Sequence, residues 1–516
     1  MKQFITKHQQ SVSGVLSGWD RILFRGSYRI LCVASGMMKY LWHVGVLLKN
    51  FGDHAEAMTR TLLEASQEAA RRCERPIVYL PSSAERKEDI ARRLLRENPV
   101  AAGLVCVLKC VEPCMSYEIY RDRQNKKLEL RVKRRKCLHL YHYILDPAFG
   151  LVSARIQTWF PFSIQICLNG RQWLARTMDA AGLSYRQHDN SFSWIEDFAE
   201  AQRLMDGLLK LNWPRFLDGV AEQLNPAAPT MFQRFAVPYY WSAQQTEWAT
   251  DVAFGSHADL AAIYPQLTWG AITSFSSPDV MRFLGRGFNK CFSGEVVSDF
   301  KDRPEGIRVK HRVNGNSVKM YDKGGSILRI ETTINQPREL KVFRRSERDP
   351  DGPQKWLRMR KGVADLHRRA QLSNKANERY LDALATLEST VRLEELLAPV
   401  SKPRKQKGKR IRALRLWTSS DQTLLEAINR PEFLLGGFRN RDLAGILYPD
   451  QQDTLKDRRR AAAKISYRLG ILRGHGLIAK LPNTRRYRTT PTGRQIATAS
   501  IISQRVTVGQ LTQAAA

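Results

Sequence analysis

The chain has 516 residues, a length that allows about two to four domains, each with its own hydrophobic core. Hydrophobic residues make up 43% of the chain and charged residues 26%, a balance that excludes wholesale disorder. The 83 lysines and arginines exceed the 50 aspartates and glutamates, so the formal net charge is +33. This surplus favours a polyanionic partner, and nucleic acid is the partner we expect.

Two features argue against export and membrane insertion. The N-terminal segment "MKQFITKHQQ" lacks the apolar core of a signal peptide. The apolar stretch at residues 30–48 is interrupted by Lys39 and His43, a pattern more typical of a buried helix than of a membrane span. We therefore expect a cytoplasmic protein without a membrane partner, in which the 8 cysteines stay reduced.

The chain divides into segments of different pattern. Residues 1–215 alternate strand-like and helix-like pieces, which predicts a mixed α/β N-terminal domain. After it we expect a helical segment leading into a β-rich domain at 216–345, a helical region at 346–400, a basic linker at 401–415, a winged helix-turn-helix at 416–500 and a tail at 501–516. The predicted fold class is α+β, a multidomain chain with a mixed α/β body and a C-terminal winged helix.

A group of cysteines and histidines in the N-terminal domain allows two interpretations. The group consists of Cys106, Cys110, Cys114, Cys137, His139 and His142. Thiolate and imidazole groups bind zinc, but the even C-x3-C-x3-C spacing of the first three cysteines matches no common zinc site. The alternative is a buried strand, "GLVCVLKCVEPC", in which cysteine is a small apolar residue. Whether the group binds a metal is left open.

Residues 117–143 predict paired strands around a polar turn at Gln124 and Asn125. The strands carry many basic residues, among them Arg134 and Arg135, beside several tyrosines. Such strands can follow a phosphate backbone while tyrosine rings stack on bases, and the backbone could also be that of RNA. The alternative is a solvated, charged strand face above a core of buried aromatic residues.

The C-terminal segment gives the clearest pattern. Three capped helices are followed by two strands around Pro482 and Asn483 and by a last helix, which is the element order of a winged helix. In the third helix, Ile465 and Leu469 recur at helical spacing, which predicts a buried face, while basic residues one turn apart share another face. The candidate nucleic-acid contacts of this helix and the wing are Arg458, Arg459, Arg460, Lys464, Arg468, Arg485, Arg486 and Arg488.

The stretch "GHGLIAKLPNTRRYRTTPTGR" resembles the wing and final helix of bacterial winged-helix regulators of the multiple-antibiotic-resistance-repressor kind. The resemblance covers about residues 415–500 and implies duplex DNA as the partner. Winged helices also serve as protein-interaction modules, and the density of arginine favours the DNA-binding alternative. The blocks "RIQTWFPF" and "LRIETTIN" resemble those of a bacterial protein family, a resemblance that implies no particular function.

The stretch "NGNSVKMYDKGGSILRIETTIN", residues 314–335, predicts a hairpin. By period two, Lys319, Tyr321 and Lys323 share one strand face, as do Arg329 and Glu331 on the partner strand. One interpretation is a charged surface hairpin in which Tyr321 packs and Lys323 pairs with Glu331. Another is phosphate binding without chemistry. A third is a phosphodiester-cutting site, with Tyr321 as nucleophile and with Glu331 or Asp299 holding a divalent ion.

The same hairpin resembles the Y-D-K and R-x-E strand pair of rolling-circle replication initiators from plasmids and filamentous phages. The resemblance implies a metal-dependent nicking reaction through a covalent phosphotyrosine, with roles for Tyr321, Lys323, Arg329 and Glu331. It also implies Mg2+ or Mn2+ as the cofactor of that reaction and a mobile or replicating element as the setting. The chain contains no H-x-H pair, the metal-ligand pattern of many such enzymes.

Together these patterns predict a bacterial, cytoplasmic nucleic-acid-binding protein whose partner is DNA rather than RNA. The alternatives are a metal-dependent tyrosine nicking endonuclease and an RNA-binding protein. No cofactor is expected apart from the divalent ion of the nicking alternative. The sequence predicts neither the oligomeric state nor the target site.

Overall fold

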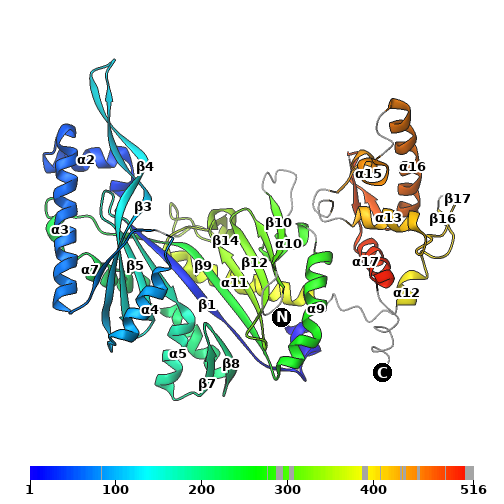
Figure 1. Cartoon of the computed structure of the whole chain (residues 1–516), viewed down its shortest axis with the longest axis horizontal. Coiled ribbons are helices and arrows are strands. Elements are labelled where there is room, and N and C mark those ends of the chain that lie inside the picture. The colour runs from blue at the N-terminus through cyan, green and yellow to red at the C-terminus, as the bar shows by residue number, and fades with distance from the viewer. Residues whose placement is uncertain are drawn as a thin grey trace. The chain divides into compact units, whose positions relative to one another are not determined.

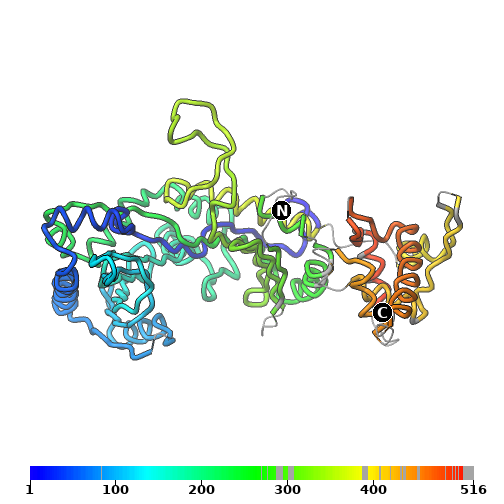
Figure 2. The backbone as a smooth tube through the Cα atoms, turned by 90° about the horizontal axis from the view of Figure 1, so that it is seen from above, coloured from blue at the N-terminus to red at the C-terminus, as the bar shows by residue number. Residues whose placement is uncertain are grey.

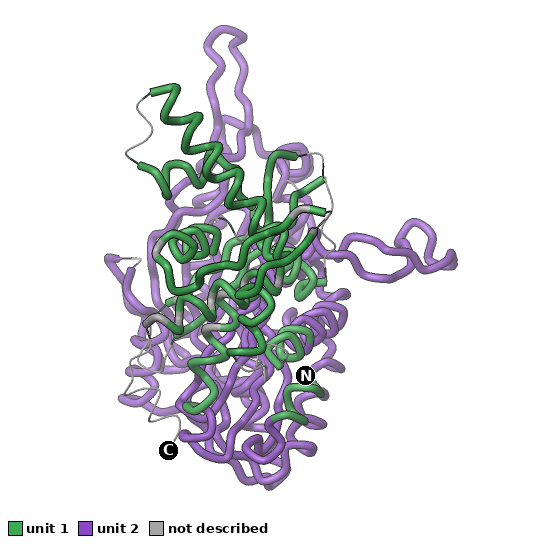
Figure 3. Tube along the Cα trace, turned by 90° about the vertical axis from the view of Figure 1, so that its right-hand side faces the viewer, with its two compact units in different colours: residues 1–7, 261–314, 379–516 green, residues 8–260, 315–378 purple. Residues whose placement is uncertain are grey.

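The computed structural model describes residues 1–505 apart from 83, 276, 286–294, 302–306, 386–392, 407, 430–432, 434–436, 450–453 and 483. The chain forms two compact units (Figure 3). Unit 1 comprises residues 1–7, 261–314 and 379–516, and unit 2 comprises residues 8–260 and 315–378. The predicted mixture of helices and strands is confirmed, with a large mixed sheet in unit 2.

The sheet of unit 2 has the strand order β12-β13-β9-β1-β6-β5-β4-β3-β2. Neighbouring strands pair antiparallel except β2 and β3, which are parallel. The strands are β1 (Val12–Ser27), β2 (Ile77–Leu80), β3 (Gly103–Asp122), β4 (Lys127–Asp146), β5 (Gly150–Gln157), β6 (Ile164–Asn169), β9 (Tyr240–Phe254), β12 (Asn316–Lys323) and β13 (Ile327–Ile334).

The long strand β1 joins the early and late parts of the chain (Figures 1 and 2). One edge of β1 pairs with β6 and the other with β9, and β9 in turn pairs with β13. Strands from the segments expected as separate domains at 1–215 and 216–345 therefore lie in one sheet. An irregularity in the β1–β9 register between Trp19 and Arg21 leaves Asp20 outside the regular pairing.

Helices and a small hairpin accompany this sheet in unit 2. They are α2 (Ala34–Val44), α3 (Phe51–Arg72), α4 (Lys87–Glu97), α5 (Gly170–Ala181), α6 (Phe198–Gly207), α7 (Trp213–Leu224), α8 (Ala228–Met231) and the pair β7 (Tyr185–His188) and β8 (Ser191–Ile195). Helices α9 (His257–Ser274) and α11 (Leu366–Ala385) begin in unit 2 and end in unit 1. Among the described residues, no helix is long and apolar enough to span a membrane.

Helix α11 covers one face of the sheet through buried Asn377. The Asn377 side-chain nitrogen donates to the carbonyl oxygens of Trp248 and Ile330. The Asn377 side-chain oxygen accepts from the Thr332 hydroxyl. Residues on the opposite face of β9 and β13, such as Asp251 and Arg329, contact α5 and the turn of the β7–β8 hairpin. This second face carries the charged side chains described below.

Strands β3 and β4 extend as a two-stranded arm beyond the rest of the sheet (Figure 1). Pairing of β5 with β4 begins at His139, and pairing of β2 with β3 ends at Cys110. Beyond these positions β3 and β4 pair with each other, which confirms the predicted paired strands at 117–143.

Residues 341–358 form a second projecting hairpin, which the sequence analysis did not predict. It consists of β14 (Lys341–Arg344) and β15 (Lys355–Arg358), joined by the turn segment "RSERDPDGPQ". The region expected to be helical at 346–400 therefore begins with this turn and with β15, and α11 starts at Leu366. The Asp-Pro-Asp-Gly sequence explains the difference, because these residues favour a turn and end a helix.

Unit 1 contains two groups of elements. The first is α1 (Lys2–Lys7), α10 (Ser277–Phe283) and the antiparallel pair β10 (Val296–Lys301) and β11 (Arg308–Val313), with the imidazole of buried His311 3.1 Å from the Tyr380 hydroxyl. The second is α12 (Leu393–Leu397), β16 (Arg404–Gln406), β17 (Lys409–Ile411), α13 (Ser419–Ile428), α15 (Asn440–Leu447), α16 (Leu455–Gly474), β18 (Ile478–Lys480), β19 (Tyr487–Thr489) and α17 (Pro491–Arg505).

The segment expected as a basic linker at 401–415 is folded against this second group. It contains the β16–β17 hairpin, and the Ile411 side chain fills the space beside Gly474. The Arg412 guanidinium also donates to both oxygens of the buried Asp421, at 2.7 Å each. The linker prediction rested on charge alone and missed these anchors, together with the buried Leu414.

Candidate functional site

The β12–β13 hairpin has the register that the sequence predicted. Tyr321 lies opposite Arg329, Lys319 opposite Glu331, and Lys323 opposite Ile327. Paired residues of antiparallel strands point to the same face, so the predicted face-sharing of these charged side chains is confirmed. The expected pair between Lys323 and Glu331 is not formed, because Lys319 occupies the position across from Glu331.

Glu331 is the centre of the first part of a buried polar network. One carboxylate oxygen accepts from the Lys319 ammonium at 2.5 Å and the other from the Tyr321 hydroxyl at 2.8 Å. Burial acts to raise the pKa of Glu331, but the Lys319 charge and these hydrogen bonds outweigh it, and the pKa is lowered. Glu331 is therefore held as a carboxylate.

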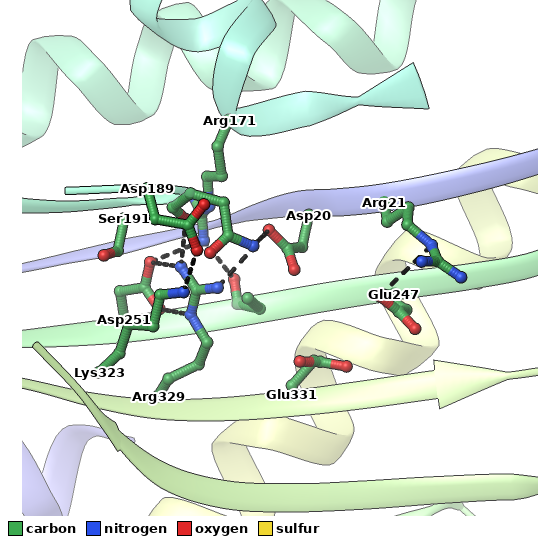
Figure 4. A network of polar contacts seen from close by, with 12 residues as sticks. Asp20, Arg21, Arg171, Asp189, Ser191, Glu247, Asp251, Lys323, Arg329 and Glu331 are labelled. Carbon is green, nitrogen blue, oxygen red and sulfur yellow. Dashed lines mark hydrogen bonds and ion pairs between the residues drawn. The ribbon is translucent and has the colours of Figure 1, made fainter. Parts of the chain in front are cut away.

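Arg329 is the centre of the second part (Figure 4). Its guanidinium donates to the two oxygens of Asp251 at 2.6 and 2.8 Å and to the backbone oxygen of Asn190 at 2.7 Å. Its Nη1 lies 3.5 Å from an oxygen of Asp20. Arg329 is completely buried, so this set of acceptors compensates a charge that would otherwise lack solvation.

A second buried arginine, Arg171, reaches Asp251 from helix α5. Its Nη2 lies 3.1 Å from Asp251 and also donates to the backbone oxygen of Ala249. The Asn169 side chain caps α5, and a Cβ at Gly170 would lie 2.1 Å from the Trp19 oxygen. Only glycine fits at this close approach, and it places Arg171 next to the sheet.

The carboxylates of the network differ in their protonation tendency. Burial acts to raise the pKa of Asp251, but the Arg329 and Arg171 charges outweigh it and lower the pKa. Burial raises the pKa of Asp20, against the opposing charge of Arg329. Burial, together with the charge of Glu331, also raises the pKa of Glu247. The network thus contains two carboxylates, Asp251 and Glu331, whose charged form is favoured by cationic partners. It also contains two, Asp20 and Glu247, whose charged form is disfavoured by burial.

The groups proposed for phosphodiester chemistry already form hydrogen bonds with side chains of the network. Burial, together with the neighbouring Glu331 charge, raises the pKa of the Tyr321 hydroxyl well above its usual value. Both oxygens of Glu331 and of Asp251 accept hydrogen bonds from side chains. Among the described residues, no group of three or more His, Cys, Asp or Glu side chains is placed to hold a metal ion. The arrangement therefore does not fit a Mg2+ or Mn2+ site.

The other two predicted members of this site, Lys323 and Asp299, form ion pairs with other residues. Lys323 pairs with Asp189 of the β7–β8 turn, with 2.6 Å between the charged atoms. Asp299 lies on β10 in unit 1, where Arg308 and Arg312 are its ion-pair partners at 3.7 and 3.6 Å.

The sequence patterns did not predict four members of the network: Asp20, Arg171, Glu247 and Asp251. Asp20 and Asp251 each stand in a largely apolar stretch, "GVLSGWDRILF" and "WATDVAF", whereas Arg171 and Glu247 have polar neighbours in the sequence. A lone charge flanked by residues with strand pattern signals a buried and paired group, because an unpaired one would be too costly. The partner of each charge lies far away in the sequence, which is why the pattern alone does not identify the pairs.

The cationic residues of the C-terminal elements fall into two groups. Arg458, Arg459, Arg460 and Lys464 of α16 are exposed, as are Arg485 and Arg488 beside and within β19. Two others bind groups of the same unit. Arg468 donates to the Tyr448 hydroxyl at 3.2 Å and to the Ser420 carbonyl oxygen, and Arg486 donates to the Gly437 carbonyl oxygen at 2.8 Å.

The β3–β4 arm exposes its basic residues but not most of its tyrosines. Arg134 and Arg135 are exposed, and Arg135 also donates to the Tyr117 carbonyl oxygen. Tyr117 is buried with its hydroxyl on the Leu31 carbonyl oxygen. The exposed ring of Tyr120 is covered by Arg131, whose guanidinium carbon lies 3.6 Å from the ring centre. The arm therefore offers charge for phosphate contact rather than open rings for stacking.

The cysteine and histidine group occupies buried and half-buried positions of β3 and β4, with Cys110 opposite His139 and with the Cys114 and Cys137 side chains hydrogen-bonded to each other. Cys106 and Cys110 pack in a small core with residues of β2 and α4. The His142 imidazole lies 3.0 Å from the Ser66 hydroxyl, and His139 donates to the Cys137 carbonyl oxygen. Burial lowers the pKa of both histidines to about 4, so their rings are neutral at physiological pH.

Comparison of the chain with family models, with curated proteins and with solved structures found no match. The function must therefore be argued from the geometry of the chain itself.

Proposed function

We propose that the protein binds nucleic acid and that its C-terminal elements bind duplex DNA as a winged helix. The observation that carries this proposal is the division of α16 into two faces. Ile465 and Leu469 are buried in the core of this part of the chain, while Arg459, Arg460 and Lys464 are exposed. A helix anchored by one face and cationic on another can enter the major groove of DNA.

The order of the elements supports this proposal. Helices α13, α15 and α16 precede the β18–β19 hairpin, and α17 follows it. Phe438, just before α15, forms a single bridge with Tyr487, which ties β19 to the start of α15. The Asn440 side chain at the start of α15 donates to Ala462 and Ser466 of α16, which fixes the angle between the two helices. Arg485 and Arg488 of the hairpin are exposed, and in the proposed complex they contact the phosphate backbone next to the groove.

The proposal can be tested by fluorescence anisotropy with a labelled duplex at several salt concentrations. Arg460→Ala with Lys464→Ala should weaken binding and reduce the slope of log K against log salt by about 1.8, if each cation contacts one phosphate. The matched control is Arg72→Ala with Arg93→Ala, which removes the same charge from exposed helix positions of unit 2. Equal effects of the two double variants would show that binding depends only on the net charge of the protein. Unchanged binding in the α16 variant would show that α16 does not contact the DNA. A structured RNA used as competitor tests the RNA-binding alternative.

A narrower observation supports a second function, the nicking of one DNA strand. The Tyr321 hydroxyl donates to Glu331 at 2.8 Å, an arrangement in which a base lies next to a nucleophile. The burial of Tyr321 and its raised pKa oppose this function. The test is conversion of supercoiled plasmid to open circles with Mg2+ or Mn2+ present. Intact plasmid, or equal activity in Tyr321→Phe, would remove the nicking proposal and with it the link to a replicating element.

A further inference from the structure

The β14–β15 hairpin of unit 2 has two different faces. Its register pairs Lys341 with Arg358, Val342 with Leu357, and Phe343 with Trp356. Paired residues share a face, and alternate residues along a strand do so as well. One face therefore carries Val342 and Leu357, and the outer face carries Lys341, Phe343, Trp356 and Arg358.

The inner face anchors the hairpin to the body of unit 2. Val342 packs in a small core with Ile334, Leu340 and Met359. The backbone nitrogen of Met359 donates to Leu340, and the Arg344 guanidinium donates to the Arg358 carbonyl oxygen. These contacts hold the two short strands together at their base, so the outer face is presented on a defined scaffold.

The outer face is open. Phe343 is 53% exposed and Trp356 is 66% exposed, although the two rings contact each other with 5.6 Å between their centres. Figure 2 shows the hairpin projecting from the rest of unit 2, as the yellow-green loop at the top of the view. Large aromatic side chains normally contribute by burial, so two adjacent exposed rings require an explanation.

The charges around the rings favour a polyanion. Lys341 and Arg358 flank the aromatic pair on the same face, and Lys355 and Arg345 nearby are also exposed. The carboxylates of the hairpin, Glu347, Asp349 and Asp351, lie in the turn rather than on the strands, and Glu347 forms an ion pair with Arg360. A polyanion would therefore meet the strands and not the turn.

We infer that the outer face of the β14–β15 hairpin binds single-stranded nucleic acid, with unpaired bases stacked on Phe343 and Trp356 and phosphates on Lys341 and Arg358. Bases offer flat faces for stacking only where they are not enclosed in a duplex, which is why the single-stranded form is the ligand. This inference rests on the proposed nucleic-acid function, but it concerns another unit of the chain and another form of the polymer.

The test uses the full-length protein and labelled oligothymidylate or oligouridylate of about 20 nucleotides, long enough to cover such a platform. Phe343→Ala with Trp356→Ala should weaken single-strand binding by about tenfold or more, since each stacked base depends on a ring. The matched control, Trp42→Ala with Trp194→Ala, removes two exposed indoles elsewhere in unit 2 and should leave binding within about twofold. Phe343→Tyr with Trp356→Phe keeps both rings and should bind as the unaltered protein does, which separates lost stacking from a misfolded hairpin.

The remaining measurements separate this inference from the proposed function. Duplex binding through α16 should persist in the hairpin variant, and single-strand binding should persist in Arg460→Ala with Lys464→Ala. Lys341→Ala with Arg358→Ala should reduce the salt slope of single-strand binding by about 1.4. The inference is overturned if the unaltered protein does not bind single strands, or if the hairpin and control variants bind equally well. Comparison of the thymidylate and uridylate strands distinguishes DNA from RNA as the source of the bases.

Discussion

Arg329 and Asp251 face each other across β13 and β9, joined by two hydrogen bonds of 2.6 and 2.8 Å, with both side chains buried. Around them, Asp20 comes from β1 and Arg171 from α5 (Figure 4). The backbone oxygen of Asn190 comes from the β7–β8 turn. The pair therefore links strands, helix and hairpin that are far apart in the sequence. Its role in the structure is to fix how these elements meet.

We predict that Asp251→Asn lowers the free energy of unfolding by about 3 to 5 kcal/mol, because it leaves two buried guanidinium groups with one carboxylate fewer. Urea denaturation followed by circular dichroism measures the change. Asp189→Asn is the control, since Asp189 forms an ion pair with Lys323 but its side chain is 69% exposed, and we expect a cost below about 1 kcal/mol. Equal costs for the two variants would contradict the structural importance of the Arg329–Asp251 pair.

A second prediction concerns Glu247, whose pKa is raised by burial and by the charge of Glu331. A carboxyl with a raised pKa binds its proton more tightly in the folded state, so its contribution to stability falls as the pH rises from the unfolded pKa through the folded pKa. Glu247→Gln keeps a side-chain oxygen for the hydrogen bond from Gln245. It should therefore raise the free energy of unfolding at pH 7.5 relative to the unaltered protein, and the gain should shrink at pH 4.

Asp251→Asn should show the opposite sign. Its cost in free energy of unfolding should shrink as the pH falls, because the pKa of Asp251 is lowered.

Local sequence patterns predicted several features of this structure. Alternation of polar and apolar residues gave the face-sharing of Tyr321, Arg329 and Glu331, and helical spacing gave the buried Ile465 and Leu469 of α16. The pairing of β1 with β9 could not be read in the same way. Which strands meet depends on contacts between residues more than 200 positions apart, such as Leu16 with Asp251, and a single strand pattern contains no information on its partner.

The same limit explains the errors at the candidate site. The sequence grouped Asp299 with Tyr321 because both lie in a β-rich stretch, but it did not predict that Asp299 pairs with Arg308 and Arg312. The buried arginine Arg171 lies on a helix whose other residues gave an ordinary amphipathic pattern. The exposed pair of Phe343 and Trp356 was not predicted, because the two residues belong to strands only four residues long, too short for a clear alternating pattern.

Gly170 offers a test of how α5 places Arg171. A Cβ at this position would lie 2.1 Å from the backbone oxygen of Trp19, so Gly170→Ala must push α5 away from β1. We expect a loss of about 1 to 3 kcal/mol in the free energy of unfolding, typical of overpacking. Gly470→Ala in α16 is the control, because nothing lies within 4 Å of its Cβ position and alanine favours a helix by about 0.5 to 1 kcal/mol over glycine. A Gly170→Ala protein as stable as the Gly470→Ala protein would show that α5 is not held closely at this point.

The cations of α16 should separate into two roles. Arg468 donates to the Tyr448 hydroxyl and to Ser420, whereas Arg459 is exposed on the same helix. Because Arg468 connects α16 to neighbouring elements, Arg468→Ala should lower the free energy of unfolding by about 1 to 2 kcal/mol and change duplex affinity little. Arg459→Ala should do the reverse, with unchanged stability and a salt slope of duplex binding reduced by about 0.9. Thermal melting and anisotropy on the same two variants make the comparison. Loss of duplex affinity in Arg468→Ala without loss of stability would mean that this side chain leaves Tyr448 to contact DNA.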